Sequence, residues 1–549
     1  MARARAEQRR TAKQIVKGYE RAEGEAQLWR HLWRLCYRYT MPHRDVVDKR
    51  SSGQYQGQYI FDSTGSDAAH NGISRLMQNL FPPDSDWIKL NPGAATPEAV
   101  KHQAATILDQ ASAIWHSLMK RSNFSTAGNE GLYDLYVGTM ALLFEEGDLV
   151  DPFVFHSVPT PMIAVEPGPN GQWRAIYRKV SMRASNVKDT WPGAELPAEI
   201  EKKLGTDDDP ELEIIDCCYR DFATGKSYYE VVLKSPEKRL LKNPETYDGT
   251  PPWGLVYWTK MPDESFGRGP IVHALPDILT ANKTVEILLK NASISMTGIW
   301  TATDDGVLNP NNVRLTPGTI IPVARNQGHP MGPSLAPLTP PGKFDLGQIV
   351  LADLQERIRR TLFDTRLPPD TGPVRSAYEI SERIAATQMD IGAPFTRVYK
   401  ELVVWLVHRG LQIMQRKKLI DYPVVIDGST VDVEIVSPIA RTRGMGEVKN
   451  VLAWLDMIAP LGPELVALTA RVETIPHWIA EQLNVPPALI RPPAEKSALM
   501  QTVAMMMARQ QQPPADQGPP PGDTGPENPV TAGAAPYGSD LDGAEGSVQ

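Results

Sequence analysis

Cysteine is scarce in this 549-residue sequence, which has only Cys36, Cys217 and Cys218. An odd number with one adjacent pair fits neither a disulfide framework nor a zinc-ligand spacing, and it indicates a reducing compartment. Long apolar runs are missing too: the longest, such as Leu402–Val407, are far too short to cross a bilayer. We therefore expect neither a disulfide-rich secreted protein nor a membrane partner.

A basic excess is also lacking, because 65 acidic residues outnumber 57 Lys and Arg and the net charge is −8. Proteins that coat nucleic acid carry clustered positive charge, so the balance argues against that class but not against a protein through which DNA passes. The segment Gln511–Gln549 holds six of the acids, eight prolines, seven glycines and no Lys or Arg. It has too few large apolar side chains to form a core, and we expect it to be disordered.

Complete signatures of catalysis are absent. Thr224-Gly225-Lys226-Ser227 ends like a phosphate-binding loop, but Arg220 stands where that loop needs its first glycine, and a strand rather than a helix should follow. We interpret it as a hairpin turn. No zinc-protease helix and no G-x-S-x-G turn occur. The pair Asp84 and Asp86 and the run Asp207–Asp209 could attract a cation, although acidic loop tips are the commoner reading. We expect no catalytic, cofactor or metal site.

Helical periodicity dominates the rest of the chain. The stripe within residues 11–39 repeats in steps of four and three, and we expect it to pack on its own chain rather than in a coiled coil with another. Its members are Ile15, Tyr19, Ala22, Ala26, Trp29, Trp33 and Cys36. Further helices are expected at Ser66–Leu80, Pro97–Arg121, Pro270–Met296, Leu346–Phe363, from a capping box at Ser376 and Glu379 to Lys418 with a break at Pro394, and in pieces from about 437 to 509. The expected apolar face of 270–296 consists of Ile278, Leu279, Val285, Leu288, Leu289 and Ala292. That of 346–363 repeats every four residues, at Leu346, Val350, Leu354, Ile358 and Leu362.

Between about 150 and 260 the pattern changes to short strands separated by Pro, Gly and Asp. The expected strands are Pro152–Val158, Trp173–Val180, Leu212–Tyr219, Ser227–Leu233 and Leu255–Thr259. No helical crossovers separate them, which indicates an antiparallel region and not a doubly wound nucleotide-binding sheet. Gly267-Arg268-Gly269-Pro270 then suits a tight turn into a helix with proline at its first position. The expected fold class is α+β, mainly helical.

Four segments in order carry a family resemblance. They are Ala68–Leu90 with Ser74-Arg75-Leu76-Met77 and Leu80-Phe81-Pro82, Ser265–Pro270 leading to Leu275-Pro276-Asp277, Arg375–Ile380 followed by Gly392-Ala393-Pro394, and Ser437–Ala440. Over about residues 10–505 the chain resembles the podophage portal proteins, the head-to-tail connectors of short-tailed bacteriophages. Ser376-Ala377-Tyr378 departs from the Thr-Ala-Glu that relatives often show, but it leaves the helix cap intact.

The resemblance implies a portal fold with wing, stem, clip and crown regions. In this sequence the regions would be 1–270 (N-terminal helices and α/β wing), 271–298 (first stem helix), 299–343 (clip), 344–366 (second stem helix), 367–375 (tunnel loop), 376–436 (long wing helix and strands), 437–510 (crown helices) and 511–549 (tail). The tunnel loop contains Leu367, Pro368, Pro369, Asp370, Thr371, Gly372 and Pro373, whose prolines and glycine cannot continue either flanking helix.

The resemblance also implies a function. Relatives form a twelve-membered ring at one capsid vertex, admit double-stranded DNA, carry the large terminase during packaging and bind tail adaptor or gatekeeper proteins afterwards; major capsid and scaffolding proteins are further partners. The protein would assemble in the host cytoplasm and reside in the virion. We expect sparse DNA contacts from Lys283, Lys290 and Arg375; pairing of these residues with Asp or Glu of neighbouring subunits is an equal alternative. The rivals are another head-tail ring component such as an adaptor, and a packaging ATPase or nuclease.

Overall fold

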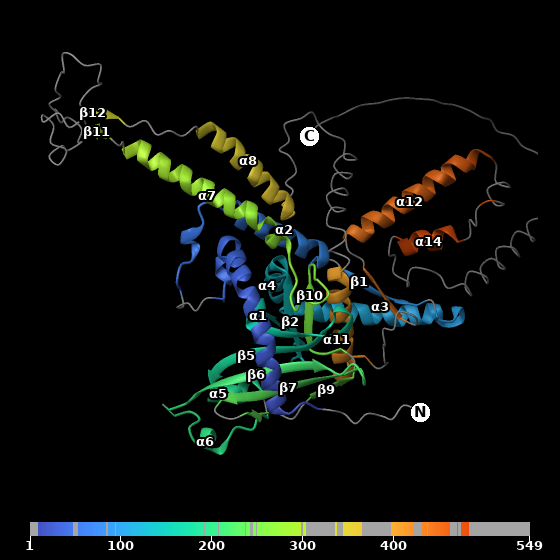
Figure 1. Cartoon of the computed structure of the whole chain (residues 1–549). Helices are drawn as coiled ribbons and strands as arrows, with labels where there is room; N and C mark the ends of the chain where they lie inside the picture. The colour runs from blue at the N-terminus through green and yellow to red at the C-terminus, as the bar shows by residue number, and fades with distance from the viewer. Residues whose placement is uncertain are drawn as a thin grey trace, which may run out of the picture. The chain divides into compact units, whose positions relative to one another are not determined.

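The computed structural model describes most of the chain up to Gln482 (Figure 1). The described residues are 9–47, 53–83, 86–93, 95–191, 193–206, 208–235, 238–241, 245–248, 250–297, 300–302, 335–337, 344–364, 397–420, 431–435, 438–461, 469 and 474–482. The expected tunnel loop, the capping box at Ser376, most of 299–343 and the segment Gln511–Gln549 lie outside these ranges. Among the described helices, none has the length and apolarity needed to span a membrane.

The first long helix, α1 (Ala12–Thr40), starts with a capping box. Gln14 N–H donates to the Thr11 hydroxyl at 3.4 Å, and Thr11 N–H donates to the Gln14 side chain at 2.8 Å. The expected apolar stripe is buried against the chain itself, with Trp29 half-buried. Ile15 and Tyr19 belong to a core shared with the large sheet, whereas Trp33 and Cys36 enter the main core. The expectation that this stripe packs on its own chain is confirmed.

Three helices follow in the main core. The predicted helices at 66–80 and 97–121 are confirmed as α2 (Thr64–Leu80) and α3 (Glu98–Arg121). The third, α4 (Phe124–Val137), was not anticipated, because Gly128 and Gly131 lower its intrinsic helix propensity. A side chain at Gly131 would collide with Met140, so the glycine permits the close packing of α4 on the strand that follows it.

The large sheet has six strands, all antiparallel, in the order β4-β5-β6-β7-β8 with β9 paired to β7. Their bounds are β4 Ile163–Pro167, β5 Trp173–Arg183, β6 Glu211–Arg220, β7 Lys226–Ser235, β8 Arg239–Leu240 and β9 Glu245–Asp248. The antiparallel prediction is confirmed. So is the hairpin turn at Thr224–Ser227: Gly225 has a φ of +72°, and its N–H donates to the Asp221 carbonyl at 2.8 Å before β7 begins.

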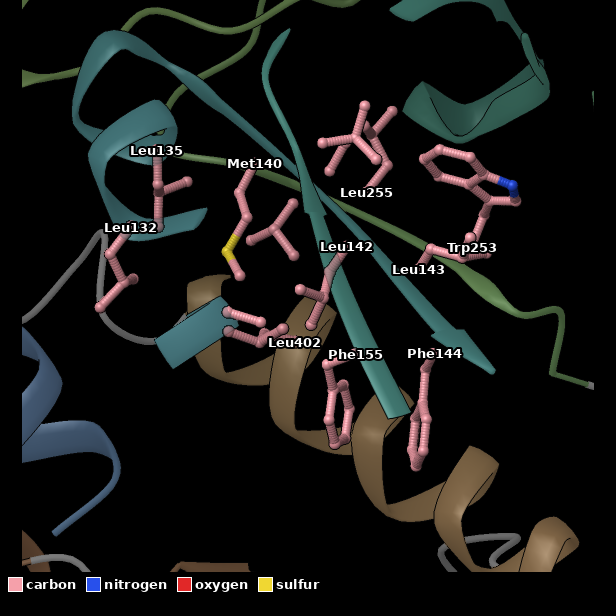
Figure 2. Close-up of a cluster of buried hydrophobic side chains, with 14 of the residues drawn as sticks. Leu132, Leu135, Met140, Leu142, Leu143, Phe144, Phe155, Trp253, Leu255 and Leu402 are labelled. Carbon is pink, nitrogen blue, oxygen red and sulfur yellow. The ribbon is translucent and has the colours of Figure 1, made fainter. Parts of the chain in front are cut away.

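A smaller sheet, β10-β2-β3, lies at the centre of the main core. Its strands are β2 (Thr139–Glu146), β3 (Phe153–Val158) and β10 (Trp253–Tyr257). Figure 2 shows Leu142, Phe144 and Phe155 pointing towards the helical segment that carries Leu402. This segment comprises a π-helical turn, Tyr399–Val403, and α11 (Val404–Arg416). The core therefore joins residues more than 250 positions apart.

The remaining elements complete a mainly helical α+β fold. They are the paired strands β1 (Ile88–Pro92) and β13 (Val431–Ile435), the paired strands β11 (Trp300–Ala302) and β12 (Leu335–Pro337), and the helices α5 (Ala184–Thr190), α6 (Ala198–Glu201), α7 (Pro270–Thr297), α8 (Phe344–Thr361), α12 (Pro438–Ile458) and α14 (Ile475–Gln482). Short 3-10 turns occur at Pro42–Arg44, Gly57–Tyr59, Thr160–Met162, Pro169–Gly171 and Ala459–Leu461.

Candidate functional site

The site that the sequence singles out is the helix pair α7 and α8, which pack on each other (Figure 1). The turn Gly267-Arg268-Gly269 leads into α7. Pro270 is the first residue of this helix, as predicted. Gly269 N–H donates to the Val137 carbonyl at 2.9 Å, and a side chain on Gly269 would collide with the Tyr136 carbonyl. This close approach requires glycine and fixes where α7 leaves the core.

The first half of α7 belongs to the main core. Ile271, Ala274, Ile278 and Ala281 are buried. The last anchor is Asn282, which is 6% exposed: its Oδ1 accepts from the N–H groups of Phe61 at 2.7 Å and Asp62 at 3.1 Å, and its Nδ2 donates to the Tyr59 carbonyl at 3.0 Å. Such a satisfied amide holds segment 53–63 to the helix.

Beyond Asn282, α7 is largely exposed. Ile287 is 48% and Leu289 54% exposed, so the predicted apolar face is buried only along the first half of the helix. Three charged residues lie here at spacings of three and four. Lys283 Nζ lies 3.0 Å from Glu286 Oε2, and Lys290 Nζ lies 2.5 Å from Glu286 Oε1. Hydrogen bonds from Lys290 and then Lys283 lower the pKa of Glu286, because they stabilise its ionised form.

The second helix, α8, is buried at its C-terminal end and exposed at its start. Leu354, Ile358 and Leu362 are buried, as the predicted four-residue spacing requires, but Val350 of the same stripe is 49% exposed. The neighbouring Ile349 is 68% exposed. Each ion pair described on its outer surface joins one arginine to one acidic residue. Arg357 pairs with Asp353, and Arg360 pairs with Glu356 at 4.0 Å. These exposed i,i+4 pairs stabilise the helix only slightly.

The end of α8 forms a corner fixed to α2. Phe363 has a positive φ of 59°, and the Asp364 N–H donates to the Arg359 carbonyl at 2.8 Å, which closes the helix. The Asp364 side chain is 1% exposed and lies 3.6 Å from the Arg75 guanidinium. Asn71 donates to its other oxygen at 3.4 Å. The described part of the helix pair therefore ends at Asp364, where α8 is held to α2, three positions before residue 367.

Of the predicted DNA contacts, Lys283 and Lys290 lie on one exposed surface of α7 and share Glu286. Arg375 and the loop residues Leu367–Pro373 lie outside the described residues. Sequence reasoning missed Glu286, although its spacing from both lysines could have revealed it. It also missed the Arg75–Asp364 pair, which no local pattern signals because 289 positions separate its members.

The part of the chain that the structure describes holds no group of three or more His, Cys, Asp or Glu able to bind a metal ion. Asp86 lies 3.1 Å from Lys120 Nζ and 3.9 Å from His116 Nδ1. Burial lowers the pKa of His116. The carboxylate of Asp134 is buried and pairs with an arginine. It accepts hydrogen bonds from Arg44 at 2.7 Å and from the Tyr37 hydroxyl at 2.6 Å. These groups serve packing between elements.

Fold and site together define a mainly helical α+β protein whose distinctive part is a pair of long helices with exposed apolar and charged outer surfaces. A family model described as bacteriophage head to tail connecting protein matches residues 12–490. The chain belongs to this family, which is structural rather than enzymatic, and the prediction of a head-to-tail connector is confirmed.

Three solved structures share weaker similarity with the chain. They are described as "Virion of native gene transfer agent (GTA) particle" (14% identity, TM-score 0.32, covering 72% of this chain and 92% of that one), "Neck of empty GTA particle computed with C6 symmetry" (13%, 0.34, 73% and 91%) and "Neck of native GTA particle computed with C12 symmetry" (14%, 0.32, 74% and 91%). No curated protein sequence matched. The family assignment rests on the match over residues 12–490.

Proposed function

We propose that the chain forms a closed ring at one capsid vertex of a podophage and that double-stranded DNA passes through its centre during packaging and ejection. The observation that carries this proposal is the connector-family match over residues 12–490. The ring would contain twelve copies, as the sequence resemblance implies, and would have no catalytic activity of its own. It would assemble in the host cytoplasm.

The outer surfaces of α7 and α8 support a ring. Ile287, Leu289, Ile349 and Val350 are large aliphatic side chains that are about half exposed or more. Exposed apolar side chains on neighbouring helices suit contact with another protein surface. The exposed aliphatic side chains of α7 on one copy can pack against those of α8 on the next, which is the head-to-tail contact that closes a ring.

The size of such a ring suits DNA. Twelve helices at a spacing of about 10 Å have their axes on a circle roughly 38 Å across, and subtracting one helix width leaves an opening of about 28 Å. Duplex DNA fits that opening. A bore crowded with cations would bind every passing phosphate, so the nearly neutral body of the chain suits a conduit through which DNA slides.

Within this ring we assign α7 and α8 to the stem, residues 299–343 to the clip and residues 367–375 to a tunnel loop facing the bore. Residues 1–270 and 376–436 would form the wing, residues 437–510 the crown and residues 511–549 a disordered tail. Lys283, Lys290 and Arg375 would contact DNA. The large terminase would bind the ring during packaging, tail adaptor or gatekeeper proteins would bind it afterwards, and the capsid and scaffolding proteins would surround it.

Native mass spectrometry and negative-stain microscopy of the purified chain test the proposal. We expect a single closed species with a central hole and a mass of about twelve chains. A monomer or a two-fold dimer as the only species, across a range of salt and protein concentrations, would rule the proposal out.

A further inference from the structure

We propose that Glu286 is a built-in counter-ion that prevents Lys283 and Lys290 from holding DNA firmly, so that DNA can slide past α7. This inference rests on the proposed function, because it requires α7 to face the bore. It assigns a positioning role to a residue that itself touches no DNA.

The geometry of the three side chains carries the inference. Each oxygen of the Glu286 carboxylate is engaged by a different ammonium group, at 3.0 Å from Lys283 and 2.5 Å from Lys290. The Glu286 side chain is 18% exposed, whereas the two lysine side chains are 64% and 67% exposed. The lysines are therefore open to an approaching anion while they pair with the carboxylate.

The shared carboxylate changes what a phosphate finds at this surface. The cluster has a net charge of +1 instead of the +2 of two free lysines, and each ammonium already has an anionic partner. A phosphate that approaches either lysine must compete with the carboxylate. When that phosphate moves on, the lysine returns to Glu286 rather than to water alone. Binding and release thus exchange one anion for another, which lowers the affinity at any one position of the DNA.

The ion pairs of α8 lack this arrangement and supply a matched control. Within the described part of the chain, Asp353 forms an ion pair with Arg357, and both side chains are about 60% exposed. Asp353→Asn removes one negative charge per chain from a stem helix, as Glu286→Gln does, but it releases one cation and leaves the α7 lysines untouched. If only total charge mattered, the two variants would behave alike.

The experiment uses full-length rings and a duplex of about 30 base pairs, with binding followed by fluorescence anisotropy between about 50 and 200 mM salt. Glu286→Gln should bind more tightly, and each additional phosphate contact should steepen the loss of affinity over that salt range by about 3.5-fold, since each adds about 0.9 to the salt slope. Asp353→Asn should shift neither property by a comparable amount. Glu286→Asp, which keeps the charge, should behave like the original chain.

A second set of variants does not depend on Glu286→Gln assembling. If Glu286 neutralises one lysine, Lys283→Gln should abolish nearly the whole contribution of the cluster to the salt slope, and adding Lys290→Gln should remove little more. Equal and additive losses from the two lysines would overturn the inference, as would a Glu286→Gln ring that binds DNA like the original. Absence of rings from the original chain would instead overturn the proposed function, so the two failures are distinguishable.

Discussion

The carboxylate of Asp364 at the end of α8 lies 3.6 Å from the guanidinium of Arg75 on α2. Because the Asp364 side chain is 1% exposed and Arg75 is 39% exposed, the arginine closes a buried acid off from solvent. The same arginine lies 3.5 Å from the Phe363 carbonyl. One residue of α2 thus binds both the backbone and the side chain of the corner at which α8 ends.

Arg75→Ala should destabilise the protein by about 1–3 kcal/mol, because it removes the guanidinium that pairs with a buried carboxylate. Urea unfolding followed by tryptophan fluorescence measures the loss. Arg357→Ala is the control, since its ion pair with Asp353 is exposed and should contribute little. Equal stability of the Arg75 and Arg357 variants would show that the corner does not depend on this ion pair.

Gly72→Ala should separate α2 from α8. A methyl group at Gly72 would collide with the Leu362 carbonyl and lie 2.7 Å from the Tyr136 hydroxyl, and a backbone atom cannot move aside cheaply. We expect a loss of about 1–3 kcal/mol in the free energy of unfolding. Gly24→Ala on α1 meets nothing within 4 Å and should instead stabilise its helix by about 0.5–1 kcal/mol. The idea fails if both alanines shift the unfolding midpoint in the same direction.

Glu230 on β7 should make stability depend on pH. Its side chain is buried, one oxygen accepts from the Tyr219 hydroxyl at 2.7 Å, and the other has no hydrogen bond from the described residues. Burial raises the pKa of Glu230 above its ordinary value of 4.5. Between 4.5 and the folded pKa, the folded protein binds more protons than the unfolded chain, so stability falls as pH rises through that window.

The glutamine side chain of Glu230→Gln cannot ionise. The stability of this variant relative to the original chain should therefore differ little near pH 4 and increase as pH rises. Urea unfolding midpoints from pH 4 to 7 measure this trend. Glu213→Gln on β6 should behave in the opposite sense, because hydrogen bonding from Lys179 lowers the pKa of Glu213. Glu213→Gln should lower the free energy of unfolding at neutral pH, and this loss should vanish as the solution becomes acidic. A pH-independent difference for Glu230→Gln would contradict the expectation.

Replacing residues 367–375 with a short Gly/Ser linker should leave rings of normal appearance that package or retain DNA poorly. The prolines and glycine of this segment prevent either flanking helix from continuing, so neither helix depends on the native loop sequence. Arg375→Ala should have a milder effect that weakens as salt rises, since a screened phosphate attraction is lost. Ring assembly, seen by negative stain, is compared with DNA retention in filled heads. Failed assembly, or unchanged packaging and retention, would remove the tunnel-loop assignment.

The elements that sequence patterns predicted are those with a regular period. The stripe of α1 and the alternating strands β5 to β7 follow directly from spacing. By contrast, α4 contains two glycines that disfavour a helix in isolation, and β2 is an apolar run that resembles a buried helix as much as a strand. The helix packs closely on Met140 through Gly131, and the strand pairs with β3 and β10, contacts that exist only in the folded chain.

For the site, the sequence located both long helices and the two lysines on α7. It could not show that the apolar stripe continues past the core, because periodicity does not distinguish a face that packs internally from one that remains exposed. Ile278 is buried and Leu289 is 54% exposed, yet both belong to the same predicted face. The Arg75–Asp364 ion pair was equally hidden, since it depends on tertiary proximity of distant segments.

The division of α7 at Asn282 has a consequence for local unfolding. A helix of 28 residues is about 42 Å long, and here only its first half shares the stability of the core. Amides before Asn282 should exchange with solvent only when the whole core opens, whereas those near Lys290 should exchange through local opening of the more exposed outer turns. Contact with a neighbouring copy would slow exchange at the outer turns without altering the core. Amide hydrogen exchange at the outer turns of α7 would thus report whether copies have assembled. Exchange at the inner turns would report whether the chain is folded.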